Sequence, residues 1–108
     1  MSVPTIDVSG LPEDAPLIDV REDDEWTAGH APGAVHIAMG QVVARLDELV
    51  AREAPLYVVC RVGGRSGQVV QYLVGNGVDA VNVSGGMQAW AAAGRPMVSE
   101  NGAAAQVI

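Results

Sequence analysis

Short runs of apolar, mostly β-branched residues alternate along the chain with segments in which apolar residues recur every three or four positions. This alternation is typical of α/β units arranged around a mostly parallel sheet. Residues 56–59 are apolar without a break, which favours a central strand covered on both faces. We therefore predict strands over 4–8, 16–20, 34–37, 55–60 and 79–83.

The segments between these strands predict helices over 22–29, 41–52, 65–74 and 85–93. The first has acidic residues in its first turn, where the helix dipole favours them. In the second, apolar residues form one stripe, and Glu48 and Arg52 stand one turn apart outside it. The stripe that we expect to face the core consists of Val42, Val43, Leu46, Leu49 and Val50.

The third and fourth segments carry clear stop signals. Gly75 follows 65–74, and Gly94 follows 85–93, in which Met87 and Trp90 are expected core anchors. The apolar face predicted for the third helix consists of Val69, Val70, Leu73 and Val74. Residues 99–108 show no period, so we expect one domain over 1–98 and a loosely ordered tail over 99–108.

Composition narrows the classes of function. A chain of 108 residues forms one domain, and its net charge of −7 argues against nucleic acid or an anionic membrane as a partner. No apolar run reaches the roughly 18 residues of a membrane span, and the first residues do not resemble a secretory signal. We therefore expect a cytoplasmic protein. The single cysteine cannot form an internal disulfide, and no spacing of the zinc type is present, so we expect no metal and no cofactor.

The candidate chemistry lies in CRVGGRS, residues 60–66, between a predicted buried strand and a predicted helix. Ligands bind beyond the carboxyl ends of strands in open α/β sheets, and amides of such a loop and helix start form an anion-binding hollow. A thiol there ionises readily, and no adjacent base is required. Arg61 and Arg65 form a local cationic patch that can attract an anionic substrate against the net negative charge.

Two interpretations of Cys60 stay open at this point. A cysteine at the end of a buried strand is often a small hydrophobic residue without chemistry. Glycines and arginines on its C-terminal side favour a reactive site instead. Neither His30 nor His36 has a sequence context that indicates a Cys–His pair.

Three blocks of this sequence resemble single-domain rhodaneses, a family of persulfide-forming sulfurtransferases, over about residues 3–98. LIDVREDDEWTAGHAPGAVHI (17–37) resembles the first signature of the family, and VVCRVGGRS (58–66) its active-site loop. VNVSGGMQAWAAAGRPM (81–97) resembles its closing signature. The resemblance implies a three-layer α/β/α fold with a central, mostly parallel five-stranded sheet.

The resemblance also implies a reaction. Cys60 would take the outer sulfur of a small anionic donor such as thiosulfate, hold it as a persulfide, and pass it to an external thiol, sulfur-carrier protein or cyanide. Asp19 and Arg21 would be structural residues near the site, and Ser66 would begin the helix as its cap. Arg61 would either contact the donor or only steer it, and Arg65 would orient it. The implied active-site loop consists of Arg61, Val62, Gly63, Gly64, Arg65 and Ser66.

Other functions of the same fold are considered as alternatives. Phosphatases and arsenate reductases with this fold place five residues between the cysteine and the arginine, whereas Arg61 to Gly64 are four. A phosphatase also needs an acid for its leaving group, and the loop offers none. A non-catalytic docking module would typically lack the cysteine. A sulfur relay to a specific partner would use the same chemistry at Cys60, so the sequence leaves that alternative open.

Overall fold

The computed structural model describes residues 3–108 and contains one sheet of five parallel strands in the order β1-β5-β4-β2-β3. Each predicted strand segment overlaps one of them, and only β5 extends, by one residue, beyond its predicted segment. The expectation of a mostly parallel five-stranded sheet is therefore confirmed. The strands are β1 (Thr5–Asp7), β2 (Leu17–Asp19), β3 (Val35–His36), β4 (Leu56–Val59) and β5 (Ala80–Ser84).

Strand β4 occupies the centre of the sheet. Its residue Val58 lies opposite Ile18 of β2 on one side and Asn82 of β5 on the other. Val58 and Val59 are both fully buried, one on each side of the sheet. The unbroken apolar run of β4 is explained by this position, because both faces of a central parallel strand are covered.

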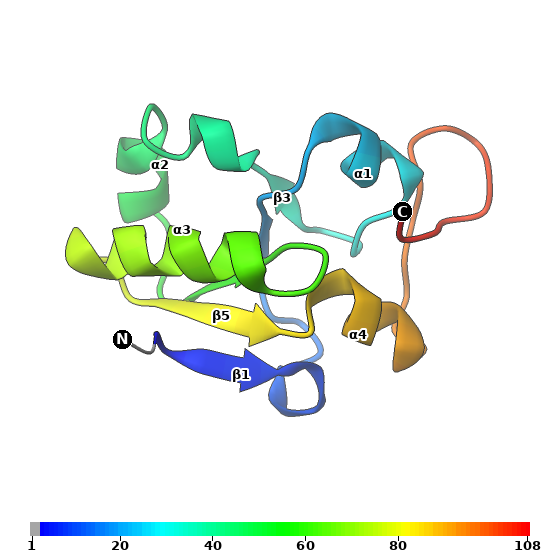
Figure 1. The fold of residues 1–108 in the computed structure, drawn as a ribbon, viewed down its shortest axis with the longest axis horizontal. Coiled ribbons are helices and arrows are strands. Elements are labelled where there is room, and N and C mark those ends of the chain that lie inside the picture. Colours follow the sequence, from blue (N-terminus) through cyan, green and yellow to red (C-terminus); the bar gives the residue numbers. More distant parts are fainter. Residues whose placement is uncertain (1–2) are drawn as a thin grey trace.

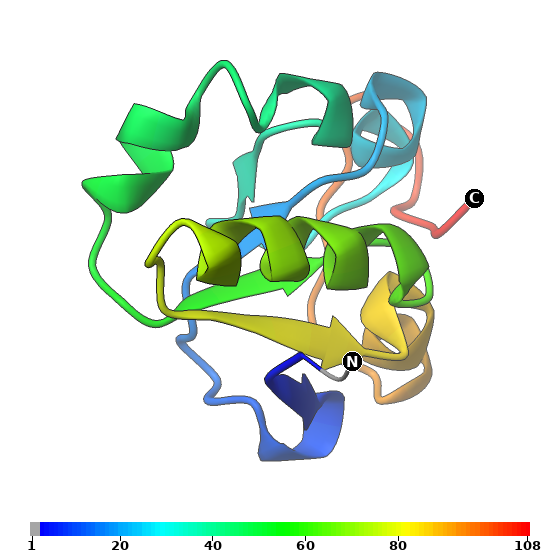
Figure 2. The same ribbon diagram turned by 60° about the vertical axis from the view of Figure 1, so that its left-hand side comes forward.

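Helices cover both faces of the sheet, as a three-layer α/β/α fold requires. Helices α2 (Leu46–Val50) and α3 (Gly64–Gly75) pack on one face, and α3 runs alongside β5 (Figure 1). Helix α4 (Gly86–Ala92) and the 3-10 turn η1 (Val8–Gly10) pack on the other face, so α3 lies in front of the sheet in Figure 2 and α4 behind it. Helix α1 (Asp23–Ala28) follows β2.

The helix predicted over 41–52 is wrong in its length and in part of its buried face. Residues 39–41 form a separate 3-10 turn, η2 (Met39–Gln41), and α2 does not begin until Leu46. Val42 and Leu49 are buried, but Val43 is 69% and Val50 is 56% exposed. The bend between η2 and α2 rotates the two halves of the apolar stripe, so only part of it faces the core.

An ion pair at the end of β2 is completely buried. Arg21 donates to both carboxylate oxygens of Asp19, with the shortest contact at 2.8 Å, and neither side chain is exposed to solvent. The Arg21 guanidinium also donates to the carbonyl of Gly29 at 2.7 Å, which joins β2 to the turn after α1. Asp19 and Arg21 therefore connect β2, α1 and the following turn.

Residues 99–108 run back along α1, although we expected a loosely ordered tail. The amides of Glu100 and Gln106 donate to the carbonyls of Thr27 and Ala28, and the Glu100 carboxylate lies 2.9 Å from Nε2 of His30. Figure 1 shows this returning segment in orange and red beside α1. These contacts are made with residues about 70 positions earlier, so no local period could indicate them.

Residues 3–108 contain no helix with both the length and the apolar character needed to cross a membrane.

Replacing Asp19 by asparagine should lower the free energy of unfolding by about 3–5 kcal/mol, because it leaves the buried Arg21 charge without its counter-ion. Urea denaturation measures the change. Asp79→Asn is the matched control, since Asp79 is exposed, and should change stability by less than about 0.5 kcal/mol. Equal losses in the two variants would contradict the structural role of the pair.

Candidate active site

Cys60 follows the last residue of β4, at the carboxyl edge of the sheet, and the chain turns from there into α3. The turn is completed by Gly63, whose φ of 116° lies in a region that residues with a side chain rarely adopt. Gly63 is also the N-cap of α3, so the loop closes directly onto the helix. This sequence of strand, glycine turn and helix places the thiol beneath the backbone amides of the loop.

The sulfur of Cys60 is buried and is contacted by hydrogen-bond donors of that loop. The Gly63 amide donates to Sγ at 3.1 Å, and the Ser66 hydroxyl lies 3.2 Å from Sγ. The residue is 1% exposed. Amides of the loop therefore face the thiol, as the anion-binding interpretation predicts. Cys60 also belongs to the apolar cluster between the sheet and helices α2 and α3.

The pKa of Cys60 is set by two opposing effects. Burial raises the pKa of the thiol, because it penalises the charged thiolate. Hydrogen bonds from the Ser66 hydroxyl and from the amides of Ser66, Gly63 and Val62 stabilise the thiolate and lower the pKa. The hydrogen bonds outweigh burial, so the pKa of Cys60 lies below that of an ordinary thiol.

The start of α4 supports the loop from the other side. The amides of Met87 and Gln88 donate to the carbonyls of Cys60 and Arg61 at 2.8 and 3.0 Å. A Cβ on Gly86 would overlap both carbonyl oxygens. Gly85 and Gly86, at the start of α4, therefore allow this helix to approach the backbone of the loop closely.

Arg65 is held by a carboxylate from α1. Its two terminal nitrogens donate to the two oxygens of Glu25 at 2.6 and 2.8 Å, and Glu25 also accepts the amide of Glu22 at the start of α1. The hydrogen bond from Arg65 is the main reason that the pKa of Glu25 lies below its usual range, and the same contact raises the pKa of Arg65. The pair connects α1 to the first turn of α3.

Arg61 and Val62 lie on the outside of the loop. Val62 is 52% exposed, and Arg61 is exposed as well. The Nε atom of Arg61 donates to the backbone oxygen of Ile108 at 3.0 Å, so the end of the described chain reaches the loop. Arg61 is thus an accessible cation next to Cys60, whereas Arg65 is already paired.

Ser66 is not the helix cap that we expected. Helix α3 begins at Gly64 with Gly63 as its N-cap, so Ser66 lies within the first turn. Its side chain is fully buried, and its hydroxyl lies 2.6 Å from Oδ1 of Asn82 on β5 as well as close to Cys60. Because the glycine turn starts the helix two residues before Ser66, the Ser66 side chain lies inside the first turn, where its hydroxyl is close to the sulfur.

The structure brings together most of the predicted loop and adds two residues that the sequence analysis missed. Glu25 pairs with a residue 40 positions away, so no local pattern could reveal it. Asn82 could have been noticed in the sequence, because it is a polar residue inside an otherwise apolar strand.

The two histidines lie apart from the thiol. His30 and His36 stack on Trp26, with ring centroids 3.5 and 4.8 Å apart, and no histidine of residues 3–108 bonds to Cys60.

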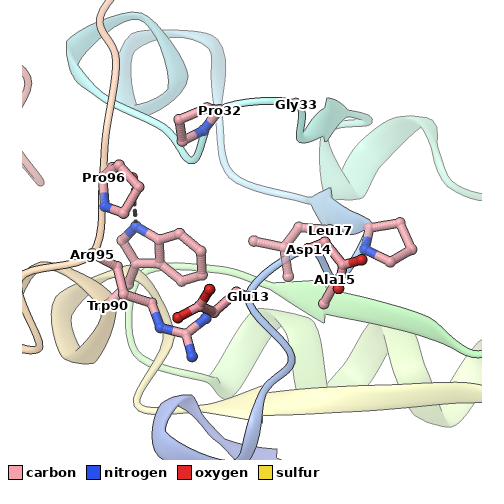
Figure 3. Close-up of a pocket in the computed structure, with 10 residues that line it drawn as sticks. Glu13, Asp14, Ala15, Leu17, Pro32, Gly33, Trp90, Arg95 and Pro96 are labelled. Atoms are coloured by element: carbon pink, nitrogen blue, oxygen red, sulfur yellow. Dashed lines mark hydrogen bonds between the residues drawn. The ribbon is translucent and has the colours of Figure 1, made fainter.

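A separate hollow of about 580 Å³ lies elsewhere on the molecule (Figure 3). Its wall includes Trp90, whose ring nitrogen donates to the carbonyl of Pro96, and Arg95, whose guanidinium lies 5.0 Å from the Trp90 ring centroid. None of the loop residues 60–66 lines it. The hollow is therefore separate from the loop that holds Cys60.

Comparison with known proteins gives consistent matches over most of the chain. Residues 7–93 match the family model described as Rhodanese-like domain. The chain is 43% identical over 84 residues to "Putative sulfurtransferase YtwF" of Bacillus subtilis, covering 78% of this chain and 81% of that protein. It is 35% identical over 91 residues to the "Sulfurtransferase" of Allochromatium vinosum, covering 83% and 84%.

A solved structure agrees with these sequence matches. The crystal structure of a rhodanese-related protein from Thermoplasma volcanium superposes with a TM-score of 0.81 at 30% identity, covering 88% of this chain and 97% of that chain.

The folded protein should form its thiolate at lower pH than the same chain unfolded in urea, because the loop donors are present only in the fold. Thiolate absorbance in the ultraviolet, with Cys60→Ser as the blank, measures both midpoints. Since the folded pKa is the lower one, ionisation stabilises the fold fully above the unfolded pKa of about 8.5. That stabilisation is lost as the pH falls through the folded pKa. A folded midpoint equal to or above the unfolded one would contradict the donor arrangement.

Proposed function

The chain belongs to the rhodanese-like domain family, and we propose that it is a sulfurtransferase that carries a sulfane sulfur as a persulfide on Cys60. The donor is a small sulfur anion such as thiosulfate, and the acceptor is an external thiol or sulfur-carrier protein, with cyanide as a substitute in vitro. The observation that carries the proposal is the hydrogen bonding of the Cys60 sulfur by the Gly63 amide and the Ser66 hydroxyl. These donors stabilise the nucleophilic thiolate.

In the first half-reaction, the Cys60 thiolate attacks the outer sulfur of the donor. A bond forms between Sγ and that sulfur, and the sulfur–sulfur bond of thiosulfate breaks. Its electron pair leaves with sulfite, so no proton has to be transferred. The charge then resides on the outer sulfur of the persulfide, and amides of the loop are positioned to stabilise it.

In the second half-reaction, a nucleophile attacks the outer sulfur and Cys60 leaves again as a thiolate. The chain has one cysteine, so no second thiol of this chain can resolve the persulfide. The acceptor therefore comes from outside. The hydrogen bonds that lower the pKa of Cys60 also make it a better leaving group, because a less basic thiolate departs faster.

Arg61 and Arg65 have different proposed roles. Arg61 is exposed beside Cys60 and attracts the anionic donor toward the loop. Arg65 orients the donor with those of its five N–H groups that Glu25 does not use. The Glu25 pair holds the guanidinium in place at the same time, which reduces the entropy lost on binding.

Sulfur transfer is favoured over the alternatives by features of the loop. The four residues between Cys60 and Arg65 form a shorter loop than the five of the related phosphatases. A docking module would not need the donors around the sulfur. A relay that hands sulfur to one specific protein uses the same first half-reaction, and the choice of acceptor distinguishes it. A cytoplasmic location fits the proposal, since reducing conditions keep the single cysteine available as a thiol.

Incubation with thiosulfate should increase the intact mass of the protein by one sulfur atom. Subsequent cyanide should restore the original mass and release thiocyanate. Cys60→Ser should abolish both changes, because its hydroxyl cannot form a persulfide. Intact-mass spectrometry is the measurement, and dithiothreitol treatment is the control for a persulfide. Sulfur uptake by the serine variant would overturn the assignment of Cys60.

Arg65→Ala should raise the thiosulfate concentration for half-maximal rate roughly tenfold, because it removes a charged hydrogen-bond donor from the bound anion. Arg45→Ala is the matched control, since it removes another arginine–glutamate pair that involves no residue of the loop. Glu25→Gln breaks the Arg65 pair but keeps the cation, so it should affect the thiosulfate requirement less. If Glu25→Gln and Arg65→Ala have equal effects, Arg65 acts only by holding the loop.

A further inference from the structure

The hydroxyl of Ser66 has two acceptors and only one proton. Its Oγ lies 2.6 Å from Oδ1 of Asn82 and 3.2 Å from Sγ of Cys60. A hydroxyl donates one hydrogen bond, so it cannot donate to both at once. Ser66 is fully buried and Asn82 is 8% exposed, so solvent does not readily replace the bond that is lost.

The orientation of the Asn82 amide follows from its second contact. Its nitrogen, Nδ2, lies 3.2 Å from the carbonyl oxygen of Gly63, which can only accept. The oxygen of the amide therefore faces Ser66 and acts as an acceptor there. Asn82 thus contacts both the turn that closes the loop and the hydroxyl that contacts the nucleophile.

Several features of the fold place Asn82 at this point. Asn82 and Ala80 are two residues apart on β5 and project from the same face of the sheet, toward α3. Gly67 has no side chain, and a Cβ there would lie 3.4 Å from the Asn82 nitrogen. The Gly63 carbonyl already accepts the Gly67 amide at 3.0 Å, so it does not depend on Asn82 for a partner.

We propose that Asn82 is a positioning residue for Cys60, which holds the Ser66 proton when the Cys60 sulfur is uncharged and releases it when that sulfur becomes a thiolate. This inference rests on the proposed sulfur transfer, in which the charge alternates between Sγ and the outer sulfur. With the thiolate, Ser66 donates to Sγ. With the persulfide, Sγ is neutral and Ser66 donates to Asn82.

Only the hydroxyl hydrogen of Ser66 moves in this exchange, by rotation about the Cβ–Oγ bond, and no covalent bond forms or breaks.

The competition between Asn82 and Cys60 for this hydrogen affects the reactivity of the thiolate. Nucleophilicity of a thiolate falls as its pKa falls, so a sulfur with too many donors attacks slowly. Asn82 weakens the contribution of Ser66 to the thiolate and so preserves the nucleophilicity of Cys60. In the second half-reaction, Ser66 turns back to Sγ as the negative charge returns there.

The test is a comparison of Cys60 titrations by thiolate absorbance, with no sulfur donor present. Asn82→Leu removes the oxygen and the nitrogen of the side-chain amide at nearly constant size. It should lower the Cys60 pKa by about 0.5–1 unit, because Ser66 then has only Sγ as an acceptor. Ser66→Ala should raise the pKa. Asn76→Leu, at the opposite end of α3, is the matched control and should leave it unchanged.

The double variant decides whether Asn82 acts through Ser66. In the Ser66→Ala background, Asn82→Leu should produce no further shift, because the shared proton is gone. An unchanged or raised pKa in Asn82→Leu alone, or an equal shift in both backgrounds, would overturn the proposal. If Asn82→Leu does not fold, as judged by circular dichroism, Asn82→Ala replaces it in the same cycle.

A measurement on the unmodified protein completes the test. The side-chain amide resonances of Asn82 should titrate with the midpoint of the Cys60 thiolate, since Asn82 loses the Ser66 hydrogen bond as the thiolate forms. They should stay constant in Cys60→Ser. Resonances that do not move with Cys60 would overturn the proposal. Failure of sulfur uptake from thiosulfate would reject the proposed donor but would leave these titrations unaffected, so the two failures are distinguishable.

Discussion

The balance between burial and hydrogen bonding at the Cys60 sulfur is the constraint on which the rest of the site depends. A thiolate in an apolar cluster is unstable unless donors replace the water that it has lost. Here the Gly63 amide and the Ser66 hydroxyl supply those donors at 3.1 and 3.2 Å. If these donors were turned away, burial alone would raise the pKa of Cys60 and make it an unreactive core residue.

The loop keeps these donors in place because three separate elements support it. Helix α4 approaches from one side at Gly86 and hydrogen-bonds the carbonyls of Cys60 and Arg61. Helix α1 contributes Glu25, which binds Arg65 through two hydrogen bonds. Strand β5 contributes Asn82. Positioning from independent directions means that the donors need little reorganisation when charge develops on sulfur, which is the condition for electrostatic stabilisation in an active site.

The loop around Cys60 carries positive charge, whereas the molecule as a whole is negatively charged. The chain has a net charge of −7, yet Arg61 is exposed beside the sulfur and Arg65 lies in the same loop. Arg21 is compensated by Asp19, so it stabilises the end of β2 and contributes little attraction for an external anion. Arg61 donates to the backbone oxygen of Ile108 but is paired with no carboxylate side chain of residues 3–108, so it is the cation of this loop best placed to attract an anion.

Local patterns in the sequence determined the strands, the presence of a helix after the loop and the position of Cys60 at the start of a glycine turn. Apolar periodicity and glycine conformations depend on neighbouring residues, so they can be recognised without the fold. The tertiary structure decided the pairing of Arg65 with Glu25, the placement of Ser66 between Cys60 and Asn82, the division of residues 39–50 into η2 and α2, and the path of 99–108. Most of these contacts join residues from separate elements. Their formation depends on which strands become neighbours and on how the helices pack against them, and neither is encoded within a single segment.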